Sequence, residues 1–156
     1  DGEITPPGTE LAVGDTATLP VTFAGDDATL DLTVTGIEEG ENSDLDSLDF
    51  SEDISDLVPY YITVDMTVVE ADEGFGSYEP GGDMGGLIGD VDASWVGIAG
   101  DFEPCQSESF ELNVQPGDSV TTCMVAGSIE SAGPVDGADF TGSLDEYGDA
   151  HVIWRQ

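Results

Sequence analysis

The sequence predicts an all-β fold, a β-sandwich of about seven to eight short antiparallel strands joined by long acidic loops. Apolar and polar residues alternate with a period of two in several stretches, as in strands with one buried and one wet face. The 156 residues include 21 Gly and 8 Pro, so turns are frequent. No periodic pattern supports a helix longer than about ten residues. We expect one domain over residues 11–156, after a flexible tether over residues 1–10.

Three stretches in the first half of the chain predict strands. Residues 11–23 predict a pair of strands that turn at Gly14 and Asp15. Residues 28–37 alternate Leu and Val with Thr and Asp. Residues 60–69 have the longest uninterrupted β pattern, so we expect a central strand. The side chains expected to point inward there are Tyr60, Ile62, Val64, Met66 and Val68, and those expected to point outward are Tyr61, Thr63, Asp65 and Thr67.

The second half of the chain predicts shorter strands, separated by loops. The predicted strands are residues 91–98, 102–114, 119–125 and 150–154, and the predicted loops of the whole chain are residues 38–58, 72–90 and 131–143. The loop over residues 38–58 is dense in Asp, Glu and Ser. We expect no more than one helical turn in it, because Ser and Asp disfavour helix interiors.

The chain has two cysteines, Cys105 and Cys123, and they have two interpretations. In an oxidising compartment they would form a disulfide that clips sequential strands near one edge, with a stabilisation of about 3 kcal/mol. In the cytosol they would be two buried thiols. The extracellular appearance of the rest of the sequence favours the disulfide. Two Cys and one distant His fall short of the usual four zinc ligands.

The charge of the chain limits its partners more firmly than any motif does. There are 35 Asp and Glu against one Arg, no Lys and one His, which gives a formal net charge of −34. Nucleic-acid binding needs Lys and Arg to neutralise phosphates, so it is excluded. Direct binding to anionic lipid is excluded for the same reason. The charge favours metal cations and basic partners, and high salt would relieve the self-repulsion.

Four segments together resemble a known kind of extracellular domain. They are Tyr60–Val69, Phe110, Pro116–Val125 and Val152–Trp154, which give an alternating Tyr/Val strand and a Pro-Gly-acidic turn into another strand. This order resembles the immunoglobulin-like domains of actinobacterial extracellular lipoproteins, in particular DUF4352-type domains. The resemblance implies an immunoglobulin-like sandwich and an N-terminal lipid anchor outside this chain, although residues 1–10 contain no lipobox Cys. It carries no catalytic residues.

No arrangement of residues in the sequence predicts catalysis. His151 is the only imidazole, no Gly-x-Ser-x-Gly elbow accompanies it, and we interpret it as a histidine on a sheet face or edge. The Gly-rich run at residues 81–86 lacks the Lys of a phosphate-binding loop. Paired carboxylates suit glycoside hydrolysis, but pairs arise by chance in so acidic a chain. We therefore expect a protein that is not an enzyme and binds no cofactor other than calcium.

Calcium is the chemistry that the acidic loops suit best, because Ca²⁺ prefers carboxylate and carbonyl oxygens. None of the acidic groups has the spacing of an EF-hand. The candidate ligands are Asp44, Asp46 and Asp49 with Glu52 and Asp53; Asp90 and Asp92 with Asp83; and Asp136 and Asp139 with Asp145 and Glu146. Trp95 and Trp154 could stack on sugars, but we favour the core for both.

Two functions from different classes follow. The first is a non-enzymatic extracellular or cell-surface interaction module of the bacterial envelope, whose partner is a basic protein or an envelope membrane complex. The partner would contact the module through its acidic loops 38–58 and 72–90. The second is a calcium- or cation-binding module whose carboxylate loops become ordered when the ion binds.

Overall fold

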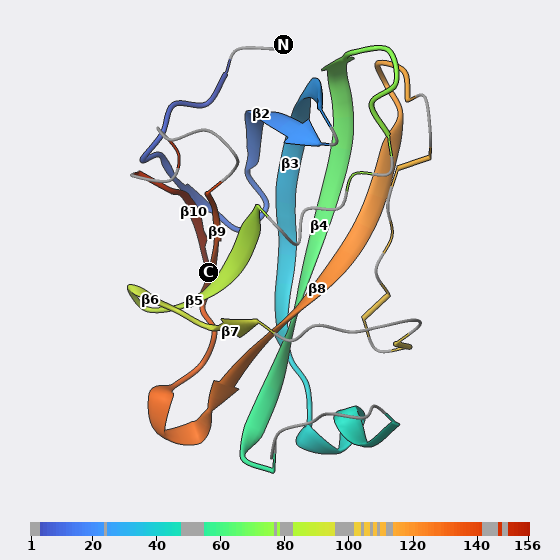
Figure 1. Cartoon of the computed structure of the whole chain (residues 1–156). Coiled ribbons are helices and arrows are strands. Elements are labelled where there is room, and N and C mark those ends of the chain that lie inside the picture. Colours follow the sequence, from blue (N-terminus) through green and yellow to red (C-terminus); the bar gives the residue numbers. More distant parts are fainter. Residues whose placement is uncertain are drawn as a thin grey trace.

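The computed structural model confirms the all-β sandwich predicted from the sequence. It describes residues 4–23, 25–47, 55–76, 78, 83–95, 102, 103, 105, 106, 108, 110, 111, 114–141, 147 and 150–156. Two five-stranded sheets pack face to face in this part of the chain (Figure 1). No helix within the described ranges is long and apolar enough to cross a membrane.

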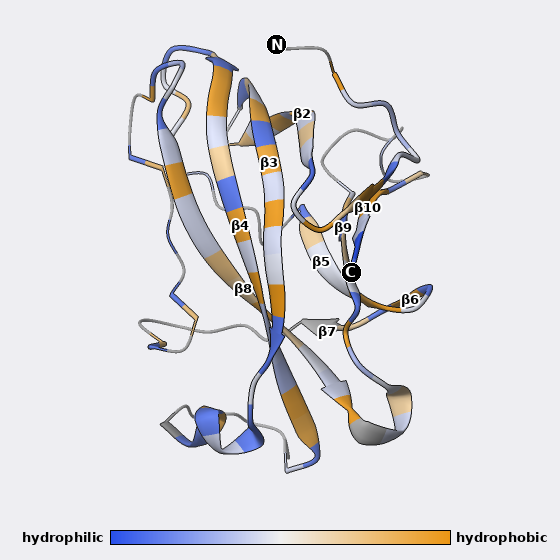
Figure 2. Cartoon of the chain, turned by 180° about the vertical axis from the view of Figure 1, so that it is seen from behind, coloured by the Kyte–Doolittle hydropathy of each residue, from blue (hydrophilic) through white to orange (hydrophobic). Residues whose placement is uncertain are grey.

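The larger sheet contains the long strands of the molecule. Its order is β2 (Thr16–Phe23), β3 (Asp26–Glu39), β4 (Leu57–Ala71), β8 (Ser119–Ile129) and β7 (Ser94–Trp95), and all its pairs are antiparallel. β4 is the central strand, as its uninterrupted β pattern predicts. Apolar residues alternate with hydrophilic ones along β3 and β4 (Figure 2), so one face of this sheet is built for the core.

The smaller sheet consists of short strands from the two ends and the middle of the chain. Its order is β1 (Glu10–Ala12), β10 (Val152–Arg155), β9 (Gly137–Phe140), β5 (Met84–Ile88) and β6 (Val91–Asp92). The first pair, β1 with β10, is parallel, and the other pairs are antiparallel. In the described connections lie two short 3₁₀ helices, η1 (Asn42–Ser47) and η3 (Glu130–Ala132).

Residues 11–23, which were predicted to form a pair of strands, instead join the two sheets. The two strands, β1 and β2, form where expected, but β1 pairs with β10 and β2 pairs with β3. Gly14 has φ of 104°, a value that favours glycine, and carries the chain from one sheet to the other. The indole N–H of Trp154 donates to the carbonyl of Asp15 (2.9 Å), and the N–H of Val13 donates to the carbonyl of Arg155 (2.9 Å). These bonds fix the crossover.

Two strands of the smaller sheet lie in segments that the sequence predicts to be loops. β5 falls within residues 72–90 and β9 within residues 131–143. A Cβ atom on Gly86 would lie 2.7 Å from that of Ala126, so this glycine allows the two sheets to approach closely. Residues 102–114 were predicted to form a strand, but none of the described residues there belongs to one.

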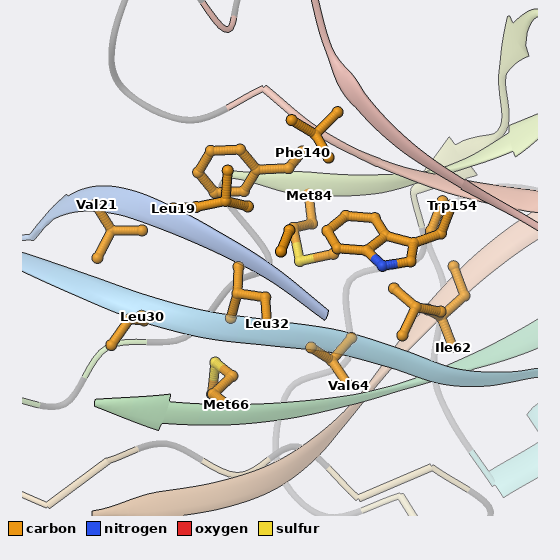
Figure 3. Packing of buried hydrophobic residues seen from close by; sticks show 14 of the residues in the cluster. Leu19, Val21, Leu30, Leu32, Ile62, Val64, Met66, Met84, Phe140 and Trp154 are labelled. Carbon is orange, nitrogen blue, oxygen red and sulfur yellow. The ribbon is translucent and has the colours of Figure 1, made fainter. Parts of the chain in front are cut away.

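The main core fills the space between the sheets (Figure 3). Trp154, on β10, is 0% exposed, which confirms that it is a core residue. Leu32 and Val64 from the larger sheet and Phe140 from the smaller one are equally buried. Each such side chain contributes roughly 1.5–3 kcal/mol to the burial free energy. The inward set predicted for β4 is confirmed, since all five of its residues belong to this cluster: Tyr60, Ile62, Val64, Met66 and Val68.

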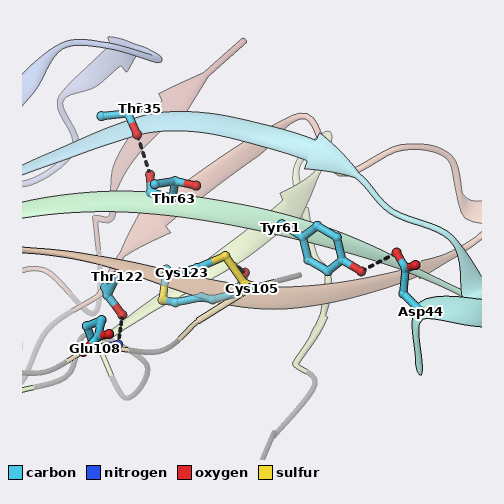
Figure 4. The surroundings of a disulfide bond; sticks show 9 residues. Thr35, Asp44, Tyr61, Thr63, Cys105, Glu108, Thr122 and Cys123 are labelled. Carbon is cyan, nitrogen blue, oxygen red and sulfur yellow. Dashed lines mark hydrogen bonds between the residues drawn. A yellow bond between two sulfur atoms is a disulfide. The ribbon is translucent and has the colours of Figure 1, made fainter. Parts of the chain in front are cut away.

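A second, smaller apolar cluster lies on the opposite side of the larger sheet, around the disulfide (Figure 4). Cys105 and Cys123 are bonded, as predicted, although only Cys123 lies on a strand. Tyr61 points away from the main core, as predicted, but it is only 8% exposed, and its ring contacts that of Phe102 edge to face at 5.9 Å. The N–H of Cys123 donates to the carbonyl of Gln106 (3.1 Å), so the disulfide-linked segment lies against β8.

Residues predicted to form a flexible tether make hydrogen bonds with both sheets. The N–H of Thr5 donates to the carbonyl of Thr18 on β2 (2.8 Å). The N–H of Gly8 donates to the carbonyl of Ala150 (2.9 Å), and the carbonyl of Thr9 accepts from Ile153 on β10 (3.0 Å). Residues 1–3 of the predicted tether lie outside the described residues.

Replacing both Cys105 and Cys123 with Ser should lower the free energy of unfolding by about 3 kcal/mol, because the disulfide closes an 18-residue separation and restricts the unfolded chain. Urea unfolding followed by tryptophan fluorescence measures the change. Adding a reductant should destabilise the native chain to the same extent and leave the double variant unchanged. Equal stability of the oxidised and reduced native chains would contradict this account.

Candidate functional site

The only Arg and the only His of the chain lie on the outer face of the smaller sheet, four residues apart in the sequence. Arg155 is the last residue of β10, and His151 directly precedes that strand. Four carboxylates predicted as calcium ligands approach them: Asp90, Asp92, Asp136 and Asp139. The sequence analysis placed these carboxylates in two separate candidate groups, one with Asp90 and Asp92 and the other with Asp136 and Asp139. They converge because the β5–β6 hairpin pairs with β9, which pairs with β10.

His151 and Asp139 form a close pair. Nδ1 of His151 lies 2.7 Å from Oδ2 of Asp139. The Asp139 side chain is 4% exposed and the His151 side chain is 31% exposed. Burial raises the pKa of Asp139, and His151 opposes this shift while the nearby charge of Asp92 adds to it. His151 lies directly before β10, and this pair links it to β9.

A His–Asp pair supplies two members of a catalytic triad, but acyl transfer also needs a nucleophile beside the imidazole. Among the described residues, no Ser, Thr or Cys side chain is hydrogen-bonded to His151. The pair can hold β9 against the start of β10.

Arg155 holds the turn between β5 and β6. Its guanidinium donates to the carbonyl of Gly89 (2.6 Å) and lies 3.1 Å from Oδ1 of Asp90 and 3.7 Å from Oδ1 of Asp136. The N–H of Gly89 donates to the same oxygen of Asp136 (3.0 Å). Because the Asp90 side chain is fully exposed, its ion pair contributes little to stability. Its main effect is to position the turn.

The acidic loop after β3 uses its first predicted calcium ligand within the fold. Oδ2 of Asp44, on η1, accepts from the Tyr61 hydroxyl (2.7 Å) and from the N–H of Glu41 (3.0 Å). These two donors lower the pKa of Asp44, and burial together with Asp44 raises the pKa of Tyr61. Asp46 is exposed on the same helix, and Asp49 lies outside the described residues.

Asp83 is similarly engaged by the chain itself. Its Oδ2 accepts from the hydroxyl of Tyr78 (2.6 Å), whose side chain is buried. Burial raises the pKa of both side chains. The carbonyl of Asp83 accepts from the N–H of Thr141 (2.7 Å), so this residue fastens the start of β5 to the end of β9.

In the described part of the chain, no three His, Cys, Asp or Glu side chains form a group that could hold a metal ion. The remaining candidates Glu52, Asp53, Asp145 and Glu146 lie outside the described residues, and so does the side chain of Trp95. The calcium hypothesis stays a prediction.

The sequence analysis did not identify the outer face of the larger sheet as a candidate site. Directly opposed residues on its strands share one side, away from the core. We call this surface the Thr–Asp face, and it comprises Thr16, Thr18, Thr22, Asp27, Thr29, Asp31, Thr33, Asp65, Thr67, Ser119 and Thr121. The signal for it was present in the sequence, since Thr and Asp recur at the outward positions of the predicted strands.

A groove of about 470 Å³ lies at one end of the Thr–Asp face. It crosses β2, β3 and β4, and its acidic lining residues are Asp27, Glu70 and Asp72. The carbonyl of Asp27 accepts from the N–H of Asp72 (2.8 Å), and Oδ2 of Asp72 accepts from the N–H of Asp27 (2.9 Å). This reciprocal pair of hydrogen bonds joins the start of β3 to the end of β4 beside the groove.

Asp139→Asn should change the pH dependence of stability. Because the pKa of Asp139 is raised from its usual 3.8, the stability it contributes is fully present below about pH 3.8 and is lost as the pH rises through the higher folded-state value. The stability of the variant relative to that of the native chain should therefore increase as the pH rises above about 4 and through the raised pKa of Asp139. Urea unfolding at several pH values tests this, with Asp46→Asn as the exposed control. A difference that does not depend on pH would contradict it.

The calcium hypothesis predicts that calcium raises the melting temperature more than magnesium does at the same ionic strength, because an ion held by carboxylates of the acidic loops stabilises the folded chain. Differential scanning fluorimetry with CaCl₂, MgCl₂ and NaCl makes the comparison. A calcium shift no larger than those of magnesium and sodium would contradict the hypothesis.

Comparison with solved structures supports the fold. The chain is similar to a secreted protein from Mycobacterium tuberculosis, MPT63, with a TM-score of 0.59 and 12% identity over 99% of this chain and 100% of that one. A second similar structure is an uncharacterized β-sandwich protein from Clostridium difficile 630, with a TM-score of 0.45 and 10% identity over 100% of this chain and 99% of that one.

Sequence comparisons add no family. No protein-family model matches the chain, and no curated protein matches it. The resemblance to DUF4352-type domains and the actinobacterial origin therefore stay predictions. What the comparisons support is a β-sandwich whose architecture is also that of a secreted bacterial protein.

Proposed function

We propose that this chain is a non-enzymatic, extracellular or cell-surface β-sandwich that acts as an interaction module for a basic protein partner. One observation carries the proposal. With a net charge of −34, the chain directs its only Arg and its only His to carboxylates of the smaller sheet. The Thr–Asp face of the larger sheet is left with carboxylates and hydroxyls and with no cationic side chain.

A basic protein is the class of partner that this charge distribution selects. The field of an acidic protein steers cationic partners toward it and raises their association rate, and it repels nucleic acid and anionic lipid. Such steering weakens as salt screens the charges, over about 8 Å at physiological ionic strength. The partner is therefore recognised by its charge as well as by its shape.

An extracellular location agrees with two observations. The Cys105–Cys123 disulfide suits an oxidising compartment. MPT63, whose architecture is similar, is a secreted protein. The resemblance to actinobacterial lipoproteins supports the finer proposal that a lipid anchor outside this chain attaches it to the envelope. An envelope membrane complex with a basic surface would then be within reach.

The absence of an enzymatic role is also part of the proposal. The His151–Asp139 pair has no nucleophile against it among the described residues, and its buried carboxylate fits a role in joining strands. The pH-dependent stability of Asp139→Asn would then be accompanied by no change in partner binding.

Affinity capture from an envelope extract tests the proposal. The immobilised chain should retain a basic protein at low salt and release it at high salt, and the purified partner should rebind saturably. An unrelated β-sandwich of similar net charge is the control. Recovery of no saturable partner at either salt, or of a partner with an acidic binding surface, would contradict the proposal.

A further inference from the structure

We propose that the Thr–Asp face docks an extended basic segment of the partner, with Lys or Arg at alternate positions, lying along β3. This inference rests on the proposed function and names the surface and the chemistry of its ligand. Hydrogen bonds, spacing and the condition of the sheet edges each support it.

Three Asp side chains on β3 and β4 each accept a hydrogen bond from a Thr hydroxyl on a neighbouring strand, β2 or β8. Thr22 donates to Oδ1 of Asp27 (2.8 Å), and Thr18 donates to Oδ1 of Asp31 (2.5 Å). Thr121 donates to Oδ1 of Asp65 (2.6 Å). In the part of the chain that the structure describes, the second oxygen of each carboxylate has no such donor. The carboxylates are therefore held in place with an acceptor to spare, which lowers the entropy cost of binding a cation.

The spacing of these carboxylates fits an extended segment. Asp31 is directly opposite Thr67, and Asp65 is directly opposite Thr33, so the two Asp residues are diagonal neighbours about 7–8 Å apart. Alternate side chains of an extended strand lie about 6.8 Å apart, which is close to the separation of these two Asp residues. Asp27 is four residues from Asp31 on β3, a separation of about 14 Å along the strand.

The groove at the end of the face provides a place for a longer side chain. Its acidic residues, Asp27, Glu70 and Asp72, surround a volume of about 470 Å³ with Pro20 and Ala28 in its walls. A Lys or Arg side chain can bury its apolar stem against such walls while its charged end reaches the carboxylates. The groove is continuous with the row of carboxylates through Asp27, which belongs to both.

The neighbouring edge of the sheet does not offer an alternative way of adding a strand. β2 is the edge strand, and its Thr18 already exchanges hydrogen bonds with Thr5, as donor to Oγ1 (2.9 Å) and as acceptor from N–H (2.8 Å). Pro20, two residues further and so on the same side of the strand, has no N–H to donate. A basic segment is therefore expected on the face and not at this edge.

Binding of two Lys/Thr peptides of identical composition tests the inference. In one peptide Lys and Thr alternate, and in the other all Lys form one block. Fluorescence anisotropy of labelled peptides at low and physiological salt gives their dissociation constants. The native chain should bind the alternating peptide more tightly. Equal affinity for the two isomers would overturn the proposal of an extended segment with alternate basic residues.

Two variants with the same change in net charge separate the face from the rest of the surface. The first replaces Asp27, Asp31 and Asp65 with Asn, and the control carries Glu10→Gln, Asp46→Asn and Asp56→Asn at exposed positions off the face. The face variant should bind the alternating peptide about tenfold more weakly, since each exposed ion pair contributes modestly. The control should lose less than about threefold. Equal losses would overturn the inference about the face while leaving general binding of basic proteins intact.

The double variant Thr22→Val with Thr121→Val tests positioning at unchanged charge. It removes two hydroxyl donors and keeps Asp27 and Asp65. Because the net charge is the same, attraction by the overall field is not altered, whereas loss of positioning should weaken the alternating peptide severalfold. Circular dichroism and the melting temperature verify that each variant is folded. An unchanged affinity in a folded double variant would overturn the role assigned to the hydroxyls.

Discussion

The scarcity of cationic side chains is the constraint on which this structure depends. With one Arg for 35 acidic residues, almost every carboxylate that the fold engages has to accept from a neutral donor. Tyrosine hydroxyls serve Asp44 and Asp83, and threonine hydroxyls serve the Thr–Asp face. Backbone N–H groups serve the turns, as at Asp118, whose Oδ2 accepts from Gln115 (2.9 Å). Hydrogen bonds to charged acceptors are stronger than those between neutral groups, so these neutral donors hold the carboxylates in place without cationic side chains.

The same constraint separates the two outer faces of the sandwich. On the smaller sheet, Arg155 forms ion pairs with carboxylates, His151 is hydrogen-bonded to Asp139, and both join β10 to its neighbours. The larger sheet lacks such groups, and its charge is compensated only by solvent ions or by a partner. Self-repulsion of this kind destabilises the compact state and is relieved by salt. The apolar core between the sheets therefore has to supply the stability that ion pairs supply elsewhere.

The strands that the sequence predicted well are those whose signal is local. β3 and β4 each alternate apolar and polar residues over many positions, and β4 has the strongest β composition. β5 and β9 were missed because they are short and rich in Gly and Ala, and their burial comes from contact with the other sheet, as at Gly86. The convergence of Asp90 and Asp136 on Arg155 depends on strand pairing between distant segments, which no local pattern contains.

The parallel pairing of β1 with β10 has a mechanical consequence. A pull on the chain before β1 and after β10 would act on the two strands in opposite directions along their axes. The register pairs Glu10–Ile153, Leu11–Trp154 and Ala12–Arg155 would then share the load in shear and could not open one after another. Trp154, buried in the core beside this junction, would have to leave its packing before the strands could slide. A domain attached through the chain before β1 and pulled by a bound partner would therefore transmit force without β1 detaching first.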